Sequence, residues 1–134
     1  NERGTFMPDQ KRILVVDDEP DFASIVQANL ESEGYTVDVA FDGVQGLVKV
    51  KETNPDLVIL DVMMPEKDGY KMAKELRNNP ETEEIPIIML TAVGDHVTTT
   101  RYSHADGMSM EADDYLAKPA SAEQILQSVK DLLD

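Results

Sequence analysis

LVILD, at residues Leu57–Asp61, is a run of four apolar residues that ends in a carboxylate. Two further apolar runs are ILVV at Ile13–Val16 and IIML at Ile87–Leu90. Each run is too short for a helix and is apolar at every position, which predicts a strand buried on both faces of a sheet. The segments Tyr35–Ala40 and Asp114–Ala117 are less uniformly apolar and predict two more strands, of which the first alternates as an edge strand does.

Helical patterns lie between these strands. Four sets of residues have the helical period: Phe22, Ile25, Val26 and Leu30 between Pro20 and Gly34; Val44, Leu47, Val48 and Lys51 after a predicted N-cap at Asp42; Tyr70, Ala73 and Leu76; and Ala122, Ile125, Leu126, Val129, Leu132 and Leu133. Ser121 and Gln124 predict a capping box at the start of the last of these helices. The fourth helix in chain order should lie within residues 93–110, where Thr98–Thr100 and Gly107 are poor helix formers.

The alternation of strands and helices predicts a parallel sheet with helices on both of its faces. Because the first, third and fourth strands are the most apolar, we expect them in the centre and the second and fifth at the edges. The predicted fold is α/β, a doubly wound five-stranded parallel sheet of order 2-1-3-4-5 with an irregular fourth helix, as in flavodoxin-like proteins. Residues 1–10 lack periodicity and predict a flexible leader, so the domain should span residues 11–134.

Acidic residues dominate the charge of the chain. There are 27 Asp and Glu residues against 12 Lys and Arg residues, a formal net charge of −15. A surface this acidic repels nucleic acid and anionic lipid, so we expect no direct nucleic-acid binding by this domain. The absence of cysteine excludes disulfides and thiolate metal sites, and no apolar run is long enough to span a membrane. We therefore expect a soluble, cytoplasmic domain whose chemistry comes from carboxylates, hydroxyls and lysines.

Polar side chains follow the predicted strands at their carboxyl ends, where open α/β sheets bind ligands. The first strand ends in Asp17 and Asp18, the third in Asp61, the fourth in Thr91 and the fifth in Lys118. Each residue alone has an ordinary structural explanation, such as a helix N-terminus or a turn. Together, however, two neighbouring carboxylates about 4 Å apart would repel by roughly 4 kcal/mol at an effective dielectric constant of about 20. Such a cluster needs a cation, and carboxylate oxygens favour Mg²⁺.

Four motifs carry a resemblance to a known family: ILVVDDE at Ile13–Glu19, LVILDVMMP at Leu57–Pro65 with Gly69 beyond it, LTA at Leu90–Ala92, and DDYLAKP at Asp113–Pro119. Together they resemble the receiver domain of two-component response regulators over roughly residues 11–134. The resemblance implies a phosphorylation-activated signalling switch. It also implies that the domain is not an enzyme with a separate substrate, because receivers catalyse only their own phosphorylation and dephosphorylation.

The resemblance assigns roles to the residues at the strand ends. Asp61 would accept a phosphoryl group from the phosphohistidine of a sensor histidine kinase or of a histidine phosphotransfer protein. The family's metal is Mg²⁺, with Mn²⁺ as a substitute. Asp18 would bind it directly and Asp17 mainly through water, and Asp61 and the backbone carbonyl of Met63 would complete the site. Lys118 would neutralise charge on the transferring phosphoryl oxygens.

A switch follows from the charge of the added phosphoryl group, about −1.5 to −2. Thr91 is expected to move inward to donate a hydrogen bond to it, and Tyr115 to rotate into the vacated space. This repacks the surface formed by the fourth helix, the fifth strand and the fifth helix. Beyond the phosphoryl donor, the resemblance implies an output partner or effector domain, with a homodimer as a further option.

Some features depart from the family pattern. Eighteen residues separate Ala92 from Glu111, a few more than is usual, and Glu111 and Ala120 stand where glycine and phenylalanine are common. We hypothesise that the fourth helix is short, displaced or partly disordered, the alternative being a surface insertion without consequence. Met63 and Val93 are both apolar and cannot orient an attacking water, which predicts slow self-dephosphorylation. The resemblance also implies a cis peptide bond between residues 118 and 119.

Three other functions compete with this interpretation. An aspartyl-phosphate hydrolase would need a second Asp where this chain has Met63. A flavin or nucleotide binder would need a Gly-rich or Ser/Thr-rich loop after the first strand, where residues 17–20 are acidic instead. The third is a phosphorylation-independent docking module with the receiver fold, against which the intact Asp, Thr and Lys set argues.

Overall fold

One parallel sheet organises the chain in the computed structural model, which describes residues 10–62, 69–92, 112–118 and 120–133. Its elements are, in chain order, β1 (Arg12–Val16), α1 (Pro20–Glu31), β2 (Thr36–Ala40), α2 (Gly43–Thr53), β3 (Leu57–Asp61), α3 (Gly69–Arg77), β4 (Ile87–Ala92), β5 (Asp114–Lys118) and α5 (Ala122–Leu133). The strands pair in parallel in the order β2-β1-β3-β4-β5. The predicted doubly wound sheet and its strand order are confirmed.

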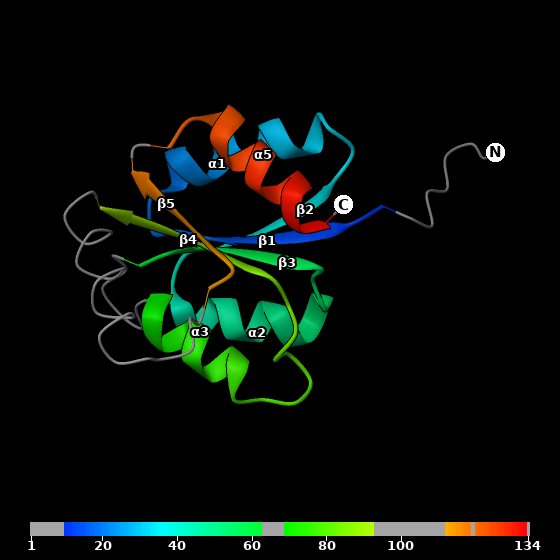
Figure 1. The fold of residues 1–134 in the computed structure, drawn as a ribbon, viewed down its shortest axis with the longest axis vertical. Coiled ribbons are helices and arrows are strands. Elements are labelled where there is room, and N and C mark those ends of the chain that lie inside the picture. The colour runs from blue at the N-terminus through cyan, green and yellow to red at the C-terminus, as the bar shows by residue number, and fades with distance from the viewer. Residues whose placement is uncertain (1–9, 63–68, 93–111, 119, 134) are drawn as a thin grey trace.

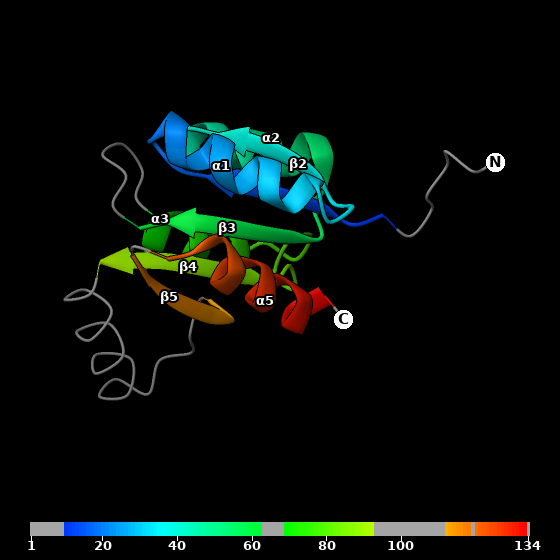
Figure 2. The same ribbon diagram turned by 90° about the horizontal axis from the view of Figure 1, so that it is seen from above.

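Helices cover both faces of this sheet (Figure 1). α1 and α5 lie on one face, and α2 and α3 lie on the other, as the view from above also shows (Figure 2). A hydrophobic core lies on each face of the sheet, and successive side chains of the central strands point into the two cores alternately. Ile13 packs with residues of α1 and α5, and Leu14 packs with residues of α2 and α3. The sheet is therefore buried on both faces, as its continuous apolar runs require.

The central and edge strands differ in burial as predicted. Every residue of β3 is buried, and residues 13–16 of β1 and 87–91 of β4 are 0% exposed. β5 is half-buried at all five positions, and β2 is buried at only two of its five. An edge strand has a neighbour on one side only, so its side chains reach water more easily.

Two predicted helix starts are confirmed by hydrogen bonds. The side chain of Asp42 accepts from the backbone N–H of Gln45 at 2.8 Å, ahead of α2. Ser121 Oγ accepts from the backbone N–H of Gln124 at 3.0 Å, while Gln124 Oε1 accepts from the backbone N–H of Ser121 at 2.9 Å. This reciprocal pair is a capping box at the start of α5.

The apolar periodicity of α1 and α2 identifies their buried faces only in part. Ile25, Val44 and Val48, placed on apolar helix patterns in the sequence, are at least half exposed. α2 instead turns Gly46 toward the sheet, where a Cβ would lie 2.8 Å from Cε of Met72. A glycine buried for close approach has no hydrophobic side chain, so the pattern could not reveal this contact.

Several sequence-based expectations lie outside the described residues. They concern residues 1–9 of the leader, the fourth helix within 93–110, the backbone carbonyl of Met63, the role of Val93, and the peptide bond between residues 118 and 119. In the part of the chain that is described, no helix has the length and apolar character that crossing a bilayer requires.

Candidate functional site

Strand pairing brings the predicted site residues to one edge of the sheet. Val16 of β1 lies opposite Leu60 of β3, so Asp17 and Asp61 follow at the same level of adjacent strands. The backbone N–H of Asp17 donates to the carbonyl of Ala40 at 3.0 Å, which extends the β1–β2 pairing by one residue beyond β1. Both carboxylates therefore stand on backbone that sheet hydrogen bonds hold in place.

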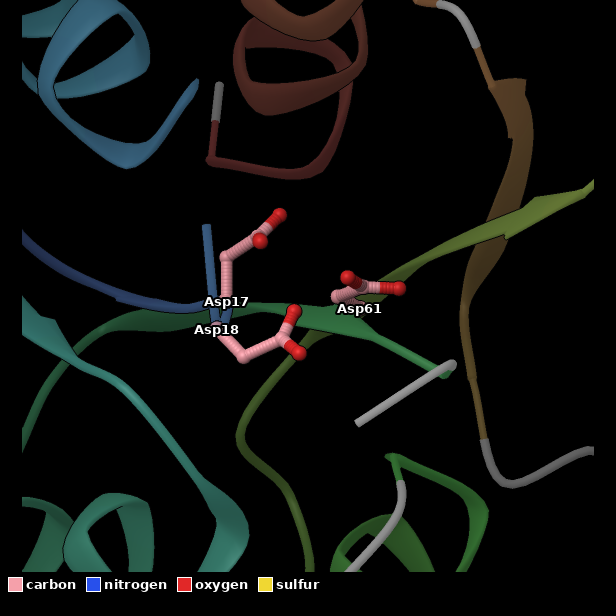
Figure 3. A group of neighbouring side chains, drawn as sticks. All are labelled: Asp17, Asp18 and Asp61. Carbon is pink, nitrogen blue, oxygen red and sulfur yellow. The ribbon is translucent and has the colours of Figure 1, made fainter. Parts of the chain in front are cut away.

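Three carboxylates converge at this edge (Figure 3). Asp17 and Asp18 follow the end of β1, next to Asp61 on β3, and one oxygen of each lies within 4.8 Å of the others. Asp17 and Asp61 are 0% and 2% exposed, whereas Asp18 is exposed to solvent. The cluster is thus buried on one side and open on the other, as a site that exchanges a ligand with solvent must be.

Lys118 supplies positive charge to this cluster. Its Nζ lies 3.1 Å from Oδ2 of Asp61, 3.7 Å from Oδ2 of Asp17 and 3.5 Å from Oε1 of Glu19. The same ammonium group lies over the ring of Phe22, 5.2 Å from its centroid. Among the described residues, this single ammonium group does not balance the charges of the surrounding carboxylates, so their sum stays negative.

The electrostatics of the site act on two pKa values. The pKa of Asp17 is raised to about 6, mainly by burial. The backbone N–H of Glu19, which donates to Asp17 Oδ1 at 2.8 Å, lowers this pKa, and the charge of Asp61 raises it; the value of about 6 is the net result. Burial alone would lower the pKa of Lys118, but the charges of Asp17, Asp61 and Glu19 outweigh burial and raise that pKa above its ordinary value. Lys118 is therefore protonated at neutral pH.

The donor set fits a divalent cation. Oδ2 of Asp17 is buried and has no hydrogen-bond partner among the described residues. A buried carboxylate oxygen without a donor is costly unless a cation faces it. Nζ of Lys118, 3.7 Å away, is beyond hydrogen-bond distance of this oxygen and lies closer to Asp61 and Glu19. All three side chains of the cluster offer hard oxygen atoms, the ligands that Mg²⁺ prefers. On these grounds Asp17, Asp18 and Asp61 are suited to hold Mg²⁺.

Thr91 and Tyr115 lie on the same face of the sheet. Met89 belongs to the core under α2 and α3, and side chains alternate along a strand, so Thr91 points to that face as well. Tyr115 pairs with Met89 across β4 and β5 and packs against the same core. Thr91 is 0% exposed, and its Oγ1 has no hydrogen-bond partner in the described part of the chain.

Three residues at the site were not assigned a role from the sequence. Glu19 stood in a quoted motif without a role, and Phe22 was interpreted only as part of a helix face. Gly69 also stood in a motif; a Cβ there would lie 2.8 Å from the carbonyl oxygen of Asp61. Glycine at this position lets the start of α3 pack directly against the end of β3.

Comparison with known sequences identifies relatives over nearly the whole chain. Residues 13–130 match the family described as the response regulator receiver domain. The chain is 40% identical over 122 residues to the DNA-binding dual master transcriptional regulator RpaA of a Synechocystis species, covering 91% of this chain and 48% of that protein. It spans about half the length of the curated relatives it matches.

Solved structures share the fold. The response regulator TrrA of Thermotoga maritima, crystallised in complex with Mg²⁺ and BeF, superposes with a TM-score of 0.76 at 37% identity, covering 92% of this chain and 99% of that one. The signal receiver domain of a histidine kinase from Syntrophus aciditrophicus superposes with a TM-score of 0.79 at 34% identity, covering 92% and 89% of the two chains.

Proposed function

The chain belongs to the response regulator receiver domain family, and from this premise we propose that it is a signalling switch in which Asp61 accepts a phosphoryl group. The proposed unit is residues 11–134. The observation that carries the proposal is the position of Asp61: its carboxylate is 2% exposed, lies among two further carboxylates and accepts a hydrogen bond from Lys118 at 3.1 Å. A buried, ion-paired carboxylate at the carboxyl end of a strand, where the sheet is open to a ligand, is suited to act as a nucleophile.

Transfer forms one bond and breaks another. An oxygen of Asp61 bonds to phosphorus as the phosphorus–nitrogen bond of the donor's phosphohistidine breaks, and the electron pair of that bond stays on the imidazole nitrogen. Lys118, already within hydrogen-bond distance of Asp61, neutralises charge on the phosphoryl oxygens. The domain catalyses only its own phosphorylation and dephosphorylation.

Asp17, Asp18 and Asp61 would hold Mg²⁺, or Mn²⁺ in its place, with the backbone carbonyl of Met63 as a further proposed ligand. When bound, the ion supplies positive charge to the phosphoryl oxygens. The cluster of carboxylate oxygens supports this assignment, as do Oδ2 of Asp17, which is buried and accepts no hydrogen bond among the described residues, and the Mg²⁺–BeF complex of the related TrrA. The positive charge of the ion would also favour the ionised form of Asp17, whose pKa is raised first by burial and then by the charge of Asp61.

Phosphorylation would be relayed through Thr91 and Tyr115. The hydroxyl of Thr91 is buried without a partner in the described residues, so a phosphoryl oxygen on Asp61 offers it an acceptor. Movement of Thr91 toward Asp61 opens space on the sheet face that Tyr115 shares. Rotation of Tyr115 then changes the surface at β5, α5 and the predicted fourth helix.

We expect a sensor histidine kinase or a histidine phosphotransfer protein as the phosphoryl donor. The relative RpaA is a DNA-binding regulator, whereas the net charge of −15 argues against direct nucleic-acid binding by this domain. The output partner is accordingly proposed to contact the surface around β5 and α5.

Intact-mass measurement after incubation with Mg²⁺ and a small acyl phosphate tests the proposed function. We expect the mass of one added phosphoryl group in the wild type, and none in Asp61→Asn or in the presence of a chelator. A phosphorylated histidine phosphotransfer protein serves as a second donor. If neither donor modifies the wild type, the proposed switch is wrong and the phosphorylation-independent docking function is favoured.

A further inference from the structure

The side chain of Lys118 is in contact with α1 as well as with the carboxylates. Its Nζ lies over the ring of Phe22, 5.2 Å from the ring centroid. This distance is within the roughly 6 Å over which an ammonium group is attracted to the negative face of an aromatic ring. Because Lys118 is only 22% exposed, the attraction is screened less than it would be at an open surface.

The carboxylates alone do not define one position for this ammonium group. Lys118 ends β5, which pairs only with β4 among the described strands, and its long side chain has several rotatable bonds. Carboxylate oxygens of Asp17, Glu19 and Asp61 lie at 3.7, 3.5 and 3.1 Å from Nζ, so a small movement exchanges one ion pair for another. A rigid group on the remaining side would restrict that movement.

Phe22 is such a group because the first turn of α1 is anchored to the site. The backbone N–H of Glu19 donates to Oδ1 of Asp17 at 2.8 Å, and Pro20 opens the helix with a restricted φ angle. The backbone N–H of Ala23 donates to the carbonyl of Glu19 at 3.0 Å, which closes the turn. The ring of Phe22 also packs against the core under α1 and α5.

We propose that Phe22 is a positioning residue whose ring holds the ammonium group of Lys118 beside Asp61 before phosphoryl transfer. This inference rests on the proposed function of Lys118 in neutralising the phosphoryl charge. It assigns the ring a role that an aliphatic side chain of similar size cannot fill, because an aliphatic group has no negative face.

Variants of Phe22 separate the ring from ordinary packing. Phe22→Leu keeps an apolar side chain and removes the ring, with Phe22→Met as a second ring-free variant should the first fold poorly. Phe22→Tyr keeps the ring and serves as the conservative rescue. Ile25→Leu is the matched control, since Ile25 is on the same helix and 57% exposed.

The first readout is the NMR spectrum of the metal-free, unphosphorylated protein. The methylene protons next to the Lys118 ammonium, assigned by their loss in Lys118→Met, should be shifted upfield by the ring current of Phe22. We expect this shift to disappear in the ring-free variants and to persist in Phe22→Tyr and Ile25→Leu. An unchanged Lys118 resonance in Phe22→Leu overturns the proposal.

The second readout is the rate of phosphorylation by a small acyl phosphate at saturating Mg²⁺. We expect the rate to fall about three- to tenfold in the ring-free variants and to stay close to that of the wild type in Phe22→Tyr. An unchanged rate in Phe22→Leu, or an equal loss in Phe22→Tyr, overturns the proposal. If the wild type accepts no phosphoryl group, the proposed function fails, and the Lys118 resonances alone decide whether the ring positions this side chain.

Discussion

Nζ of Lys118 donates a hydrogen bond to Oδ2 of Asp61 over 3.1 Å, although β4 lies between the strands that carry these two residues. The lysine side chain therefore reaches across the end of β4 to the carboxylate on β3. The positive charge of Lys118, which belongs to the edge strand β5, is thereby placed beside the proposed phosphoacceptor Asp61 on the central strand β3.

Replacing Lys118 by Gln should slow phosphorylation while leaving the nucleophile in place. We expect the rate with a small acyl phosphate at saturating Mg²⁺ to fall by about a hundredfold or more, because a fixed positive charge on the phosphoryl oxygens is lost. Lys130→Gln makes the same charge change at a surface ion pair with Glu33, 3.7 Å apart, and should have no effect. A Lys118→Gln rate within about threefold of the wild type would contradict this role.

Asp17→Asn should stabilise the metal-free domain at neutral pH. The pKa of Asp17 is raised from 3.8 to about 6 in the folded state, so folding favours the protonated form. The contribution of Asp17 to stability is fully present below about pH 4 and is lost as the pH rises through about 6. We expect the variant to be more stable by about 1–3 kcal/mol at pH 7 in urea unfolding with a chelator present, and the difference to fade near pH 4.

Added Mg²⁺ provides the control for this effect. Because the ion requires the ionised carboxylate, it should stabilise the wild type at pH 7, stabilise it less as the pH falls below about 6, and stabilise Asp17→Asn weakly. A variant that is less stable than the wild type at neutral pH without metal would contradict the account of Asp17.

Thr91→Val should separate phosphorylation from the switch. The substitution keeps the shape of Thr91 and removes a buried hydroxyl that has no partner among the described residues, so the unphosphorylated domain should be unchanged or up to about 1 kcal/mol more stable. Asp61 should still accept a phosphoryl group, detected by intact mass. The change of the Tyr115 ring resonances on phosphorylation should be lost, and its persistence in the variant would rule out relay through Thr91.

Gly69→Ala should destabilise the domain by about 1–3 kcal/mol in urea unfolding. The added Cβ would lie 2.8 Å from the carbonyl oxygen of Asp61 and 2.9 Å from Cα of Val62, backbone atoms that cannot rotate away. Gly46→Ala is the matched control, because its closest contact is the flexible end of Met72 and alanine favours the helix. A Gly69→Ala variant that is as stable as the wild type would show that the end of β3 tolerates displacement.

The fold was predictable where local pattern and burial agree. Apolar runs such as Ile13–Val16 have a strand's length and no alternation, and the less apolar segments at residues 35–40 and 114–117 correspond to the two edge strands. The proximity of Asp17, Asp18 and Asp61 then follows from the strand order, since parallel strands end at the same edge of the sheet.

The parts that could not be predicted depend on tertiary contacts. Gly46 is buried against the side chain of Met72, which lies where a Cβ of residue 46 would otherwise be in close contact. A glycine has no apolar side chain, so a hydrophobicity pattern does not indicate that this position is buried. The contact of Phe22 with Lys118 joins the first helix to the last strand, and an aromatic residue at a helical spacing is equally typical of an ordinary core position. Such contacts require the folded arrangement of elements distant in sequence.

Locating the phosphoryl group tests the central claim most directly. The wild type would be treated with a small acyl phosphate and Mg²⁺, reduced with borohydride, which converts an aspartyl phosphate to homoserine, and digested for peptide mass analysis. We predict homoserine at position 61 alone, and none in a sample treated without Mg²⁺. Homoserine at Asp17 or Asp18, or no reduced residue in a protein that gained phosphoryl mass, would contradict the assignment of Asp61 as the phosphoacceptor.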